Sequence, residues 1–68
     1  MTSAHELAEL RIAGVITHAE YDVLLLTHRG LSQRQIALAL DISRWSVRDR
    51  QHNSNRKIEI HQRRKDAA

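Results

Sequence analysis

Three capping boxes divide this sequence into short helical segments. The boxes are Ser3 with Glu6, Thr17 with Glu20, and Ser32 with Gln35. In each box the hydroxyl oxygen can accept a hydrogen bond from an N–H group of the first helical turn, and the longer side chain can return one to the capping residue. Ser43 predicts a fourth helix start, although Ser46 stands where Glu or Gln would complete the box. The sequence therefore predicts four helices.

The helix ends and the composition predict an all-α fold. The chain has no proline, and its only glycines, Gly14 and Gly30, lie where a left-handed residue would end the first and second helices. We expect helices over residues 4–13, 18–28, 33–40 and 44 to about 58. They form a single domain over residues 1–60, followed by a basic tail at 61–68 that we expect to be disordered.

The composition excludes several kinds of site. The chain has no cysteine, so it can form neither a disulfide nor a thiolate zinc site. Its five histidines are never three or four residues apart, so no pair shares a helix face as a helical zinc site requires. It has no glycine-rich phosphate loop and no recognised order of Ser, His and Asp. We therefore expect no enzyme, no metal site and no cofactor.

The apolar residues give no sign of a membrane protein. The longest apolar run, Val23–Leu26, is far shorter than the roughly 20 residues that span a bilayer. The N-terminal segment carries acidic residues, Glu6 and Glu9, whereas a secretion signal begins with a basic region. We expect a cytoplasmic protein without a membrane partner.

Charge is distributed unevenly along the chain. Residues 1–31 have two arginines and four acidic residues, a net charge of −2, whereas residues 32–68 have nine Arg or Lys and four acidic residues, a net charge of +5. Such asymmetry is typical of a protein that docks on a polyanion through one face, although a solvated basic tail would give the same count.

The second and fourth segments have opposite character. The second has a wide apolar stripe around Leu24 and Leu25 that predicts the core helix. The fourth has no apolar residue between Val47 and Ile58, so most of its surface must face water or a polar ligand. This polar stretch holds Arg44, Arg48, Arg50, Arg56 and Lys57.

The third and fourth segments have the spacing of a helix-turn-helix. Ala37 is small where two crossing helices approach closely, and Asp41 falls in the tight turn, where a residue tolerant of positive φ is favoured. Ile42 fills the space under the turn, and Val47 seats the following helix on the preceding one. We expect a trihelical helix-turn-helix core with an additional N-terminal helix, which packs either on the second helix or on a partner chain.

Residues 16–58 resemble the DNA-binding domain of LuxR-type response regulators and the similar region-four domain of bacterial sigma factors. The pattern is matched without a gap by Ile16, Thr17, Glu20, Val23, Leu24, Gly30, Leu31, Ser32, Ile36, Ala37, Leu40, Ile42, Ser43 and Val47. The chain departs from it at Asp41 for Gly, Ser46 for Thr, Trp45 for a small or polar residue, and Gln51 for an apolar one. The resemblance implies a small stand-alone, phage-like regulator in a bacterium or an infected host.

The resemblance places the fourth helix, over about residues 44–55, in the major groove of DNA as the recognition helix, with its first residues pointing at the bases. The base-reading candidates are Arg44, Trp45, Arg48 and Asp49. An arginine can bond bidentately to guanine, which is worth about 1–3 kcal/mol of discrimination. Trp45 either presses on a thymine methyl or sugar or folds back beside Val47, and Asp49 either accepts from cytosine or pairs with an arginine one turn away.

A second set of residues is expected to contact phosphates. It comprises Ser32, Gln33, Arg34, Ser43, Ser46, Arg50, Arg56 and Lys57. The serines and Gln33 lie at helix N-termini, where free N–H groups and the helix dipole attract anions, although simple capping would also explain them.

These expectations combine into a sequence-specific regulator of transcription that binds double-stranded DNA. A single small module buries about 600–1,000 Å² on DNA, so we expect a homodimer or tandem monomers. The alternative is a protein-interaction module, in which the acidic N-terminal half and Trp45 bind RNA polymerase or a partner regulator. Nonspecific coating of nucleic acid is a third hypothesis.

Overall fold

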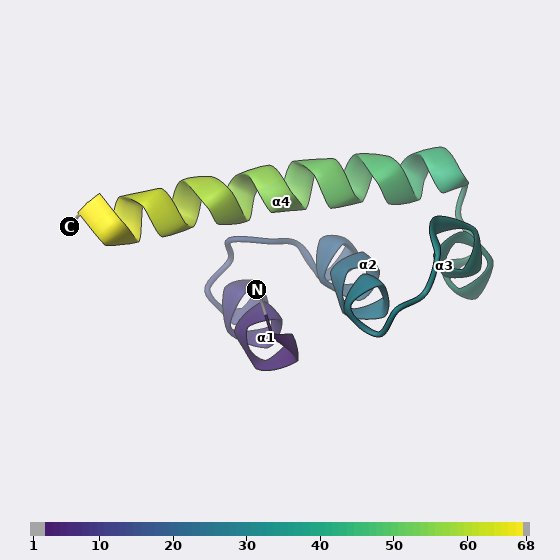
Figure 1. The fold of residues 1–68 in the computed structure, drawn as a ribbon, viewed down its shortest axis with the longest axis horizontal. Coiled ribbons are helices and arrows are strands. Elements are labelled where there is room, and N and C mark those ends of the chain that lie inside the picture. Colours follow the sequence, from purple (N-terminus) through teal and green to yellow (C-terminus); the bar gives the residue numbers. More distant parts are fainter. Residues whose placement is uncertain (1–2, 68) are drawn as a thin grey trace.

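The computed structural model describes residues 3–67, which form four α-helices. The helices are α1 (Ala4–Ile12), α2 (His18–His28), α3 (Gln33–Leu40) and α4 (Arg44–Ala67). Helices α2 and α3 have the predicted bounds, and α1 is one residue shorter than predicted. In Figure 1, α4 runs along one side of the molecule and the other three helices lie beside one another below it, seen nearly end-on; α2 and α3 pack on α4, and α1 packs on α2. The prediction of an all-α helix-turn-helix fold is confirmed.

The helix starts form as the capping boxes predict. The second and third boxes are complete, with both reciprocal hydrogen bonds present. In the first box Ser3 Oγ accepts from the Glu6 N–H at 3.2 Å, but the return contact joins the two side chains rather than reaching the backbone. At α4 the Ser43 hydroxyl accepts from the Ser46 N–H at 3.0 Å. Ser43 thus caps α4, and this hydrogen bond keeps Ser43 and Ser46 together at the start of the helix.

The turns adopt the left-handed conformations expected of them. Gly14 and Gly30 have φ of 78° and 91°, and Asp41 has φ of 54°. The N–H groups of Asp41 and Ile42 both donate to the carbonyl oxygen of Ala37, which closes the turn between α3 and α4. Asp can adopt this conformation because its short polar side chain tolerates it better than most.

The end of α4 differs from the prediction. The sequence analysis ended this helix at about residue 58 and expected residues 61–68 to be a disordered tail, whereas the structure continues the helix to Ala67. The extension contains neither glycine nor proline, and Arg63 donates to Glu59 one turn earlier at 2.6 Å. Arg64 and Lys65 in the last turn also complement the helix dipole.

The core consists of two clusters on either side of α2. The first cluster is Leu7, Ile16, Leu24 and Ile58, and the second cluster is Val23, Ile36, Ala37 and Val47. The neighbouring residues Val23 and Leu24 of α2 enter different clusters, and α2 packs on each of the other three helices. The prediction that α2 is the core helix is confirmed. Leu7 lies in the first cluster and is only 3% exposed, so α1 packs within the chain.

Helix α4 meets the rest of the protein through one stripe of residues. This inner stripe is Val47, Gln51, Ser54 and Ile58. Ser54 is fully buried, and its hydroxyl donates to the carbonyl of Arg50 in its own helix. The Gln51 amide donates to Thr27 of α2 and accepts from Gln33 of α3, both at 2.9 Å. Hydrogen bonds thus anchor Gln51 where the resembled family generally has an apolar residue.

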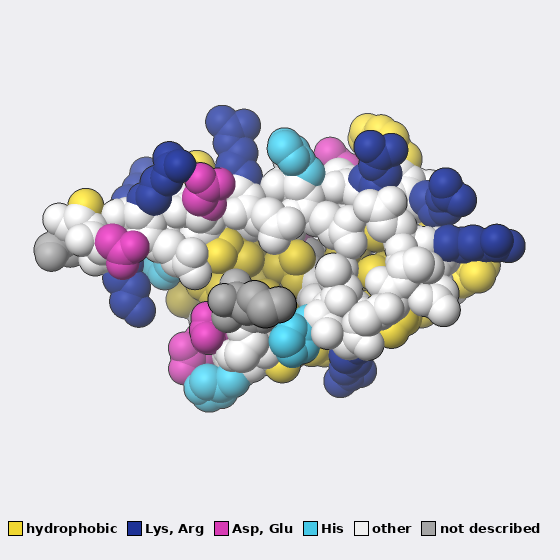
Figure 2. All heavy atoms as spheres, viewed as in Figure 1, with side chains coloured by type: hydrophobic (Ala, Val, Ile, Leu, Met, Phe, Trp, Pro, Cys, Tyr) yellow, Lys and Arg dark blue, Asp and Glu magenta, His cyan; other side chains and the backbone are white. Residues whose placement is uncertain are grey.

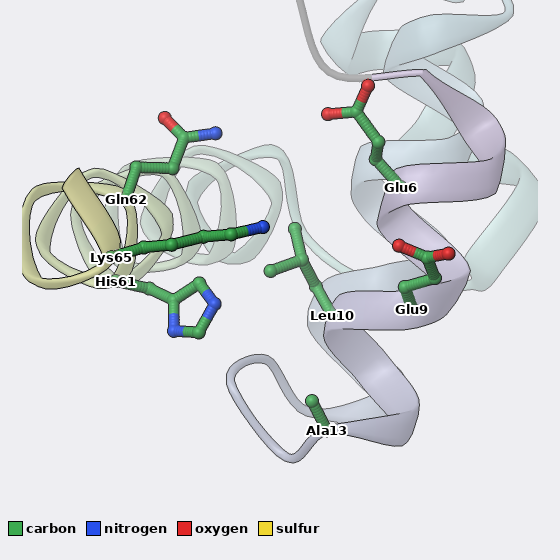
Figure 3. A pocket seen from close by; sticks show the side chains of 7 residues that line it. All are labelled: Glu6, Glu9, Leu10, Ala13, His61, Gln62 and Lys65. Carbon is green, nitrogen blue, oxygen red and sulfur yellow. The ribbon is translucent and has the colours of Figure 1, made fainter. Parts of the chain in front are cut away.

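An open hollow separates α1 from the C-terminal end of α4. Figure 3 shows Lys65 extending from α4 toward Leu10 of α1, with His61 beside it and the carboxylates of Glu6 and Glu9 across the opening. The residues of α4 that line the hollow, His61, Gln62 and Lys65, lie beyond the inner stripe and far from the first turns of the helix. No helix in the described part of the chain is both long and apolar enough to cross a membrane.

Candidate nucleic-acid interface

The four predicted base-reading residues lie on the first two turns of α4. Arg44, Trp45, Arg48 and Asp49 are all exposed, whereas Val47 between them is fully buried in the second cluster. Trp45 is 72% exposed, so the alternative in which its indole packs on the core is wrong. Asp49 forms no ion pair with an arginine among residues 3–67, contrary to the pairing that we weighed for it.

Positive charge collects on the exposed face of α4 that carries Arg44, Arg48 and Arg56, called the outer face below, and at the end where α3 meets α4. Figure 2 shows Lys and Arg side chains projecting from both places. The ion pairs among the described residues leave Arg44, Arg48 and Arg56 without a carboxylate partner. Because no acidic group neutralises them, these three guanidinium groups can bond to an external anion or to the acceptor atoms of a base.

The side chains predicted to contact phosphates at the helix starts form hydrogen bonds within the chain. The hydroxyls of Ser32 and Ser43 each accept from a first-turn N–H of their own helix, so they cap α3 and α4. Gln33 is exposed, but its amide nitrogen donates to Gln51. Ser46 accepts from the Ser43 hydroxyl at 2.9 Å. At these starts the groups left free to meet an anion are therefore the remaining first-turn N–H groups rather than these side chains.

Arg34 and Arg50 lie within the helix-turn-helix, Arg34 in α3 and Arg50 in α4. Arg34 lies exposed in the first turn of α3, and Arg50 is half-buried in the second turn of α4. Neither takes part in an ion pair among residues 3–67. Both guanidinium groups are therefore free to meet phosphates at the edges of a groove.

Lys57 is paired with an acidic residue of α2, which the sequence analysis did not anticipate. Its ammonium group donates to both carboxylate oxygens of Glu20, at 2.9 and 3.0 Å. The Glu20 side chain is only 7% exposed, whereas that of Lys57 is 46% exposed. The structure therefore gives Lys57 a partner in α2, and this pairing competes with the phosphate contact expected of it.

The carboxylate of Glu20 accepts hydrogen bonds from both the start of α2 and the middle of α4. It accepts from the Thr17 N–H at 2.8 Å, completing the α2 capping box, and it also receives Lys57 from α4. Burial raises the pKa of Glu20, but the hydrogen bonds from Thr17 and Lys57 and the positive charge of Lys57 outweigh burial and hold this pKa below its ordinary value. Glu20 therefore remains charged and fixes α4 to the start of α2.

The sequence analysis missed two residues of the exposed outer face. His52 and Asn55 follow Arg48 by four and seven residues on the same helix, and both are exposed. This spacing places all three side chains on one face of α4. The signal was present in the sequence, because the predicted fourth helix already included both residues, but the sequence analysis assigned base contacts only to the first residues of that helix.

The described residues offer no other chemical centre. No group of three or more His, Cys, Asp or Glu side chains in residues 3–67 could hold a metal ion. The hollow against α1 combines two carboxylates with Lys65 and His61, but these charges form no ion pair across it within the described part of the chain. The outer face of α4 is therefore the best candidate for the functional surface.

Comparison with known proteins identifies the family. The family model described as "Bacterial regulatory proteins, luxR family" matches residues 14–67, which include α2, α3 and α4 but not α1. No curated protein and no solved structure matches significantly. The family match covers most of the chain and ends where α4 ends. The chain belongs to the LuxR family of bacterial regulatory proteins.

Proposed function

We propose that this protein is a sequence-specific regulator of transcription that inserts the first turns of α4 into the major groove. Membership of the LuxR family makes it a DNA-binding regulator in general terms. The observation that carries the finer proposal is the outer face of α4, where Arg44 and Arg48 are exposed and have no carboxylate partner among residues 3–67. The major groove of B-DNA is wide enough to admit such a helix.

Base recognition rests on the groups that project from this face. Arg44 and Arg48 each present a forked donor that matches guanine O6 and N7. Trp45 offers a flat apolar surface to a thymine methyl or a sugar. Asp49 can accept from the amino group of cytosine and disfavours a phosphate at the same place. Together these side chains discriminate among bases rather than only adding charge.

Phosphate contacts orient the helix in the groove. The free N–H groups at the starts of α3 and α4, together with Arg34, Arg50 and Arg56, meet the DNA backbone. Ser32, Ser43, Ser46 and Gln33 act mainly by fixing those helix starts, as their hydrogen bonds within the chain support. We place Lys57 outside the phosphate-contacting set because its pairing with Glu20 is bidentate.

Two copies bind to neighbouring half-sites, and bound protein either blocks RNA polymerase or contacts it. One module of this size buries about 600–1,000 Å² on DNA, which is less than most specific complexes bury. Half-sites one helical turn apart, about 10 base pairs, would place two copies on the same side of the duplex.

Arg48→Ala tests the proposal. We expect the variant to bind its preferred duplex about tenfold more weakly and to lose its preference at one base pair, because one bidentate contact disappears. Preferred duplexes are first selected from a random pool, and dissociation constants are then measured by fluorescence anisotropy for each single-base change. Arg63→Ala is the matched control, because Arg63 is exposed on the same helix but is paired with Glu59.

Two outcomes would contradict the proposal. A wild-type protein that binds scrambled duplex as tightly as selected duplex would be a nonspecific nucleic-acid-binding protein. A protein without measurable affinity for duplex, which instead binds purified RNA polymerase through Trp45, would be an interaction module on a helix-turn-helix scaffold.

A further inference from the structure

We propose that the base-reading face of α4 continues past its first two turns, through His52 to Asn55, so that the helix reads the groove along its length. The inference rests on the proposed function and adds specificity-determining residues to it. Arg48, His52 and Asn55 are the residues that carry it. They follow one another at intervals of four and three, which keeps their side chains on one face of a helix.

The length of α4 makes such a track possible. The helix is unbroken from Arg44 to Ala67, and Asn55 lies seven residues beyond Arg48. At 1.5 Å per residue these two side chains leave the helix about 10 Å apart, close to the rise of three base-pair steps. A helix that lies lengthwise in the groove therefore brings Asn55 to base pairs that Arg48 does not reach.

The inner side of α4 is packed against the protein at the level of Asn55. Ser54 is fully buried and Ile58 is 6% exposed, so the inner stripe of α4 remains in contact with the protein on both sides of Asn55. Ile58 belongs to the first cluster, to which α1 contributes Leu7. Helix α1 therefore helps to hold this part of α4 rigid, and the outer face does not have to become ordered on binding.

The outer side chains at this level are available to a ligand. His52, Asn55, Arg56 and Glu59 line a shallow hollow on the outside of α4. Within residues 3–67, neither His52 nor Asn55 makes a side-chain hydrogen bond, and Arg56 makes no ion pair. Glu59 is paired with Arg63 at 2.6 Å. Glu59 is thus the one acidic residue that lines this hollow, and we expect the track to end there because a carboxylate repels phosphate.

The chemistry of the two side chains fits base edges. The carboxamide of Asn55 has a donor and an acceptor side by side, which match N7 and the N6 amino group of adenine. His52 has ring nitrogens that can donate to a purine N7 or accept from an amino group. Arg56, next to Asn55, suits the adjacent phosphate. The track is thus expected to prefer adenine at the base pair that Asn55 meets.

The test compares Asn55→Ala with Asn53→Ala in the full chain. Asn53 is the same residue type and is also exposed, but it lies about 200° away around α4. We expect Asn55→Ala to bind the selected duplex about tenfold more weakly and to lose the adenine preference about three base pairs from the position that Arg48→Ala relaxes. Asn53→Ala should retain the wild-type affinity and preference.

The outcomes separate the inference from the proposed function. A wild-type protein with sequence preference whose Asn55→Ala variant keeps the same preference at every position would overturn the inference and leave the proposed function standing. Uniform weakening on all duplexes would also overturn it, because it indicates a phosphate contact. A wild-type protein without any sequence preference would reject the proposed function and, with it, the extended track. Helix content and the thermal midpoint of both variants are measured to confirm that they fold.

Discussion

Glu20 is the one charged side chain that is buried in the part of the chain that the structure describes. Its carboxylate joins the start of α2 to the middle of α4 through Thr17 and Lys57. Removing one partner of a buried ion pair lowers the free energy of unfolding by more than the intact pair contributes, because the other partner is left buried without compensation. Half of Lys57 is exposed to water, which weakens the pair relative to a fully buried one.

Glu20→Gln should lower the free energy of unfolding by about 1–2 kcal/mol at pH 7, because the amide can still accept from Thr17 but no longer carries the charge that pairs with Lys57. The folded protein holds the pKa of Glu20 below its ordinary value, so this stabilisation is complete above about pH 4.3 and disappears as the pH falls through the folded pKa. Urea unfolding of both proteins from pH 7 to pH 3 should show the difference shrinking with acid.

The control for Glu20 is Glu59→Gln, which removes an exposed pair with Arg63. Both side chains of that pair are more than half exposed, so the change should cost less than about 0.5 kcal/mol at pH 7. A difference between wild type and Glu20→Gln that stayed constant down to pH 3 would refute the role given to the Glu20 charge.

Helix α1 packs on α2, which is one of the two positions expected for it. It lies outside the residues that match the LuxR family, yet Leu7 is 3% exposed and packs with Ile58 near the distal half of α4. A helix as polar as α4 has little apolar surface of its own with which to stay attached. Through the first cluster, α1 therefore helps to brace the part of α4 that follows its first two turns.

Leu7→Ala should lower the free energy of unfolding by about 2–4 kcal/mol, because it leaves a cavity between α1, α2 and α4. The loss should also speed amide hydrogen exchange in residues 58–67 more than in α3, since this end of α4 depends on the first cluster. Leu38→Ala is the matched control, because Leu38 is 76% exposed and its truncation should change stability by less than about 0.5 kcal/mol. Equal acceleration throughout the molecule would show that α1 supports only global stability.

The contrast between α3 and α4 explains how far sequence alone could predict this fold. The starts of all four helices, the bounds of α2 and α3 and the left-handed residue Asp41 were predictable, because caps and turns depend on neighbours within about four residues. The end of α4 was not, because no glycine or proline marks it. The same limit applies to Lys57, whose partner Glu20 is 37 residues away in the sequence.

The candidate site was predicted in part for the same reason. The exposure of Arg44 and Arg48 followed from the helix-turn-helix spacing alone. Trp45 could not be placed, because an indole fits either a core or a DNA surface and only the packing of Val47 decides between them. Gln51 has no local signal at all, since its hydrogen bonds reach residues in both α2 and α3.

Over the whole molecule, the charge asymmetry of the sequence becomes a difference between two regions. Glu6 and Glu9 lie on α1, whereas Arg44, Arg48 and Arg56, which have no carboxylate partner among residues 3–67, lie exposed on α4. Under the proposed function, a molecule with this distribution would approach DNA with α4 in front and α1 behind. The approach should depend strongly on ionic strength, because each cation that meets a phosphate releases counterions.

The salt dependence of binding measures how many cations meet phosphates and can separate Lys57 from the arginines. A plot of the logarithm of the association constant against that of the salt concentration should become shallower by about one unit for Arg56→Ala. For Lys57→Met the slope should stay near the wild-type value while the free energy of unfolding falls, because Lys57 is occupied by Glu20. Titrations between 50 and 200 mM salt, at a temperature where both variants are folded, provide the comparison. A slope for Lys57→Met as shallow as that for Arg56→Ala would mean that the ion pair with Glu20 opens on DNA and that Lys57 contacts a phosphate.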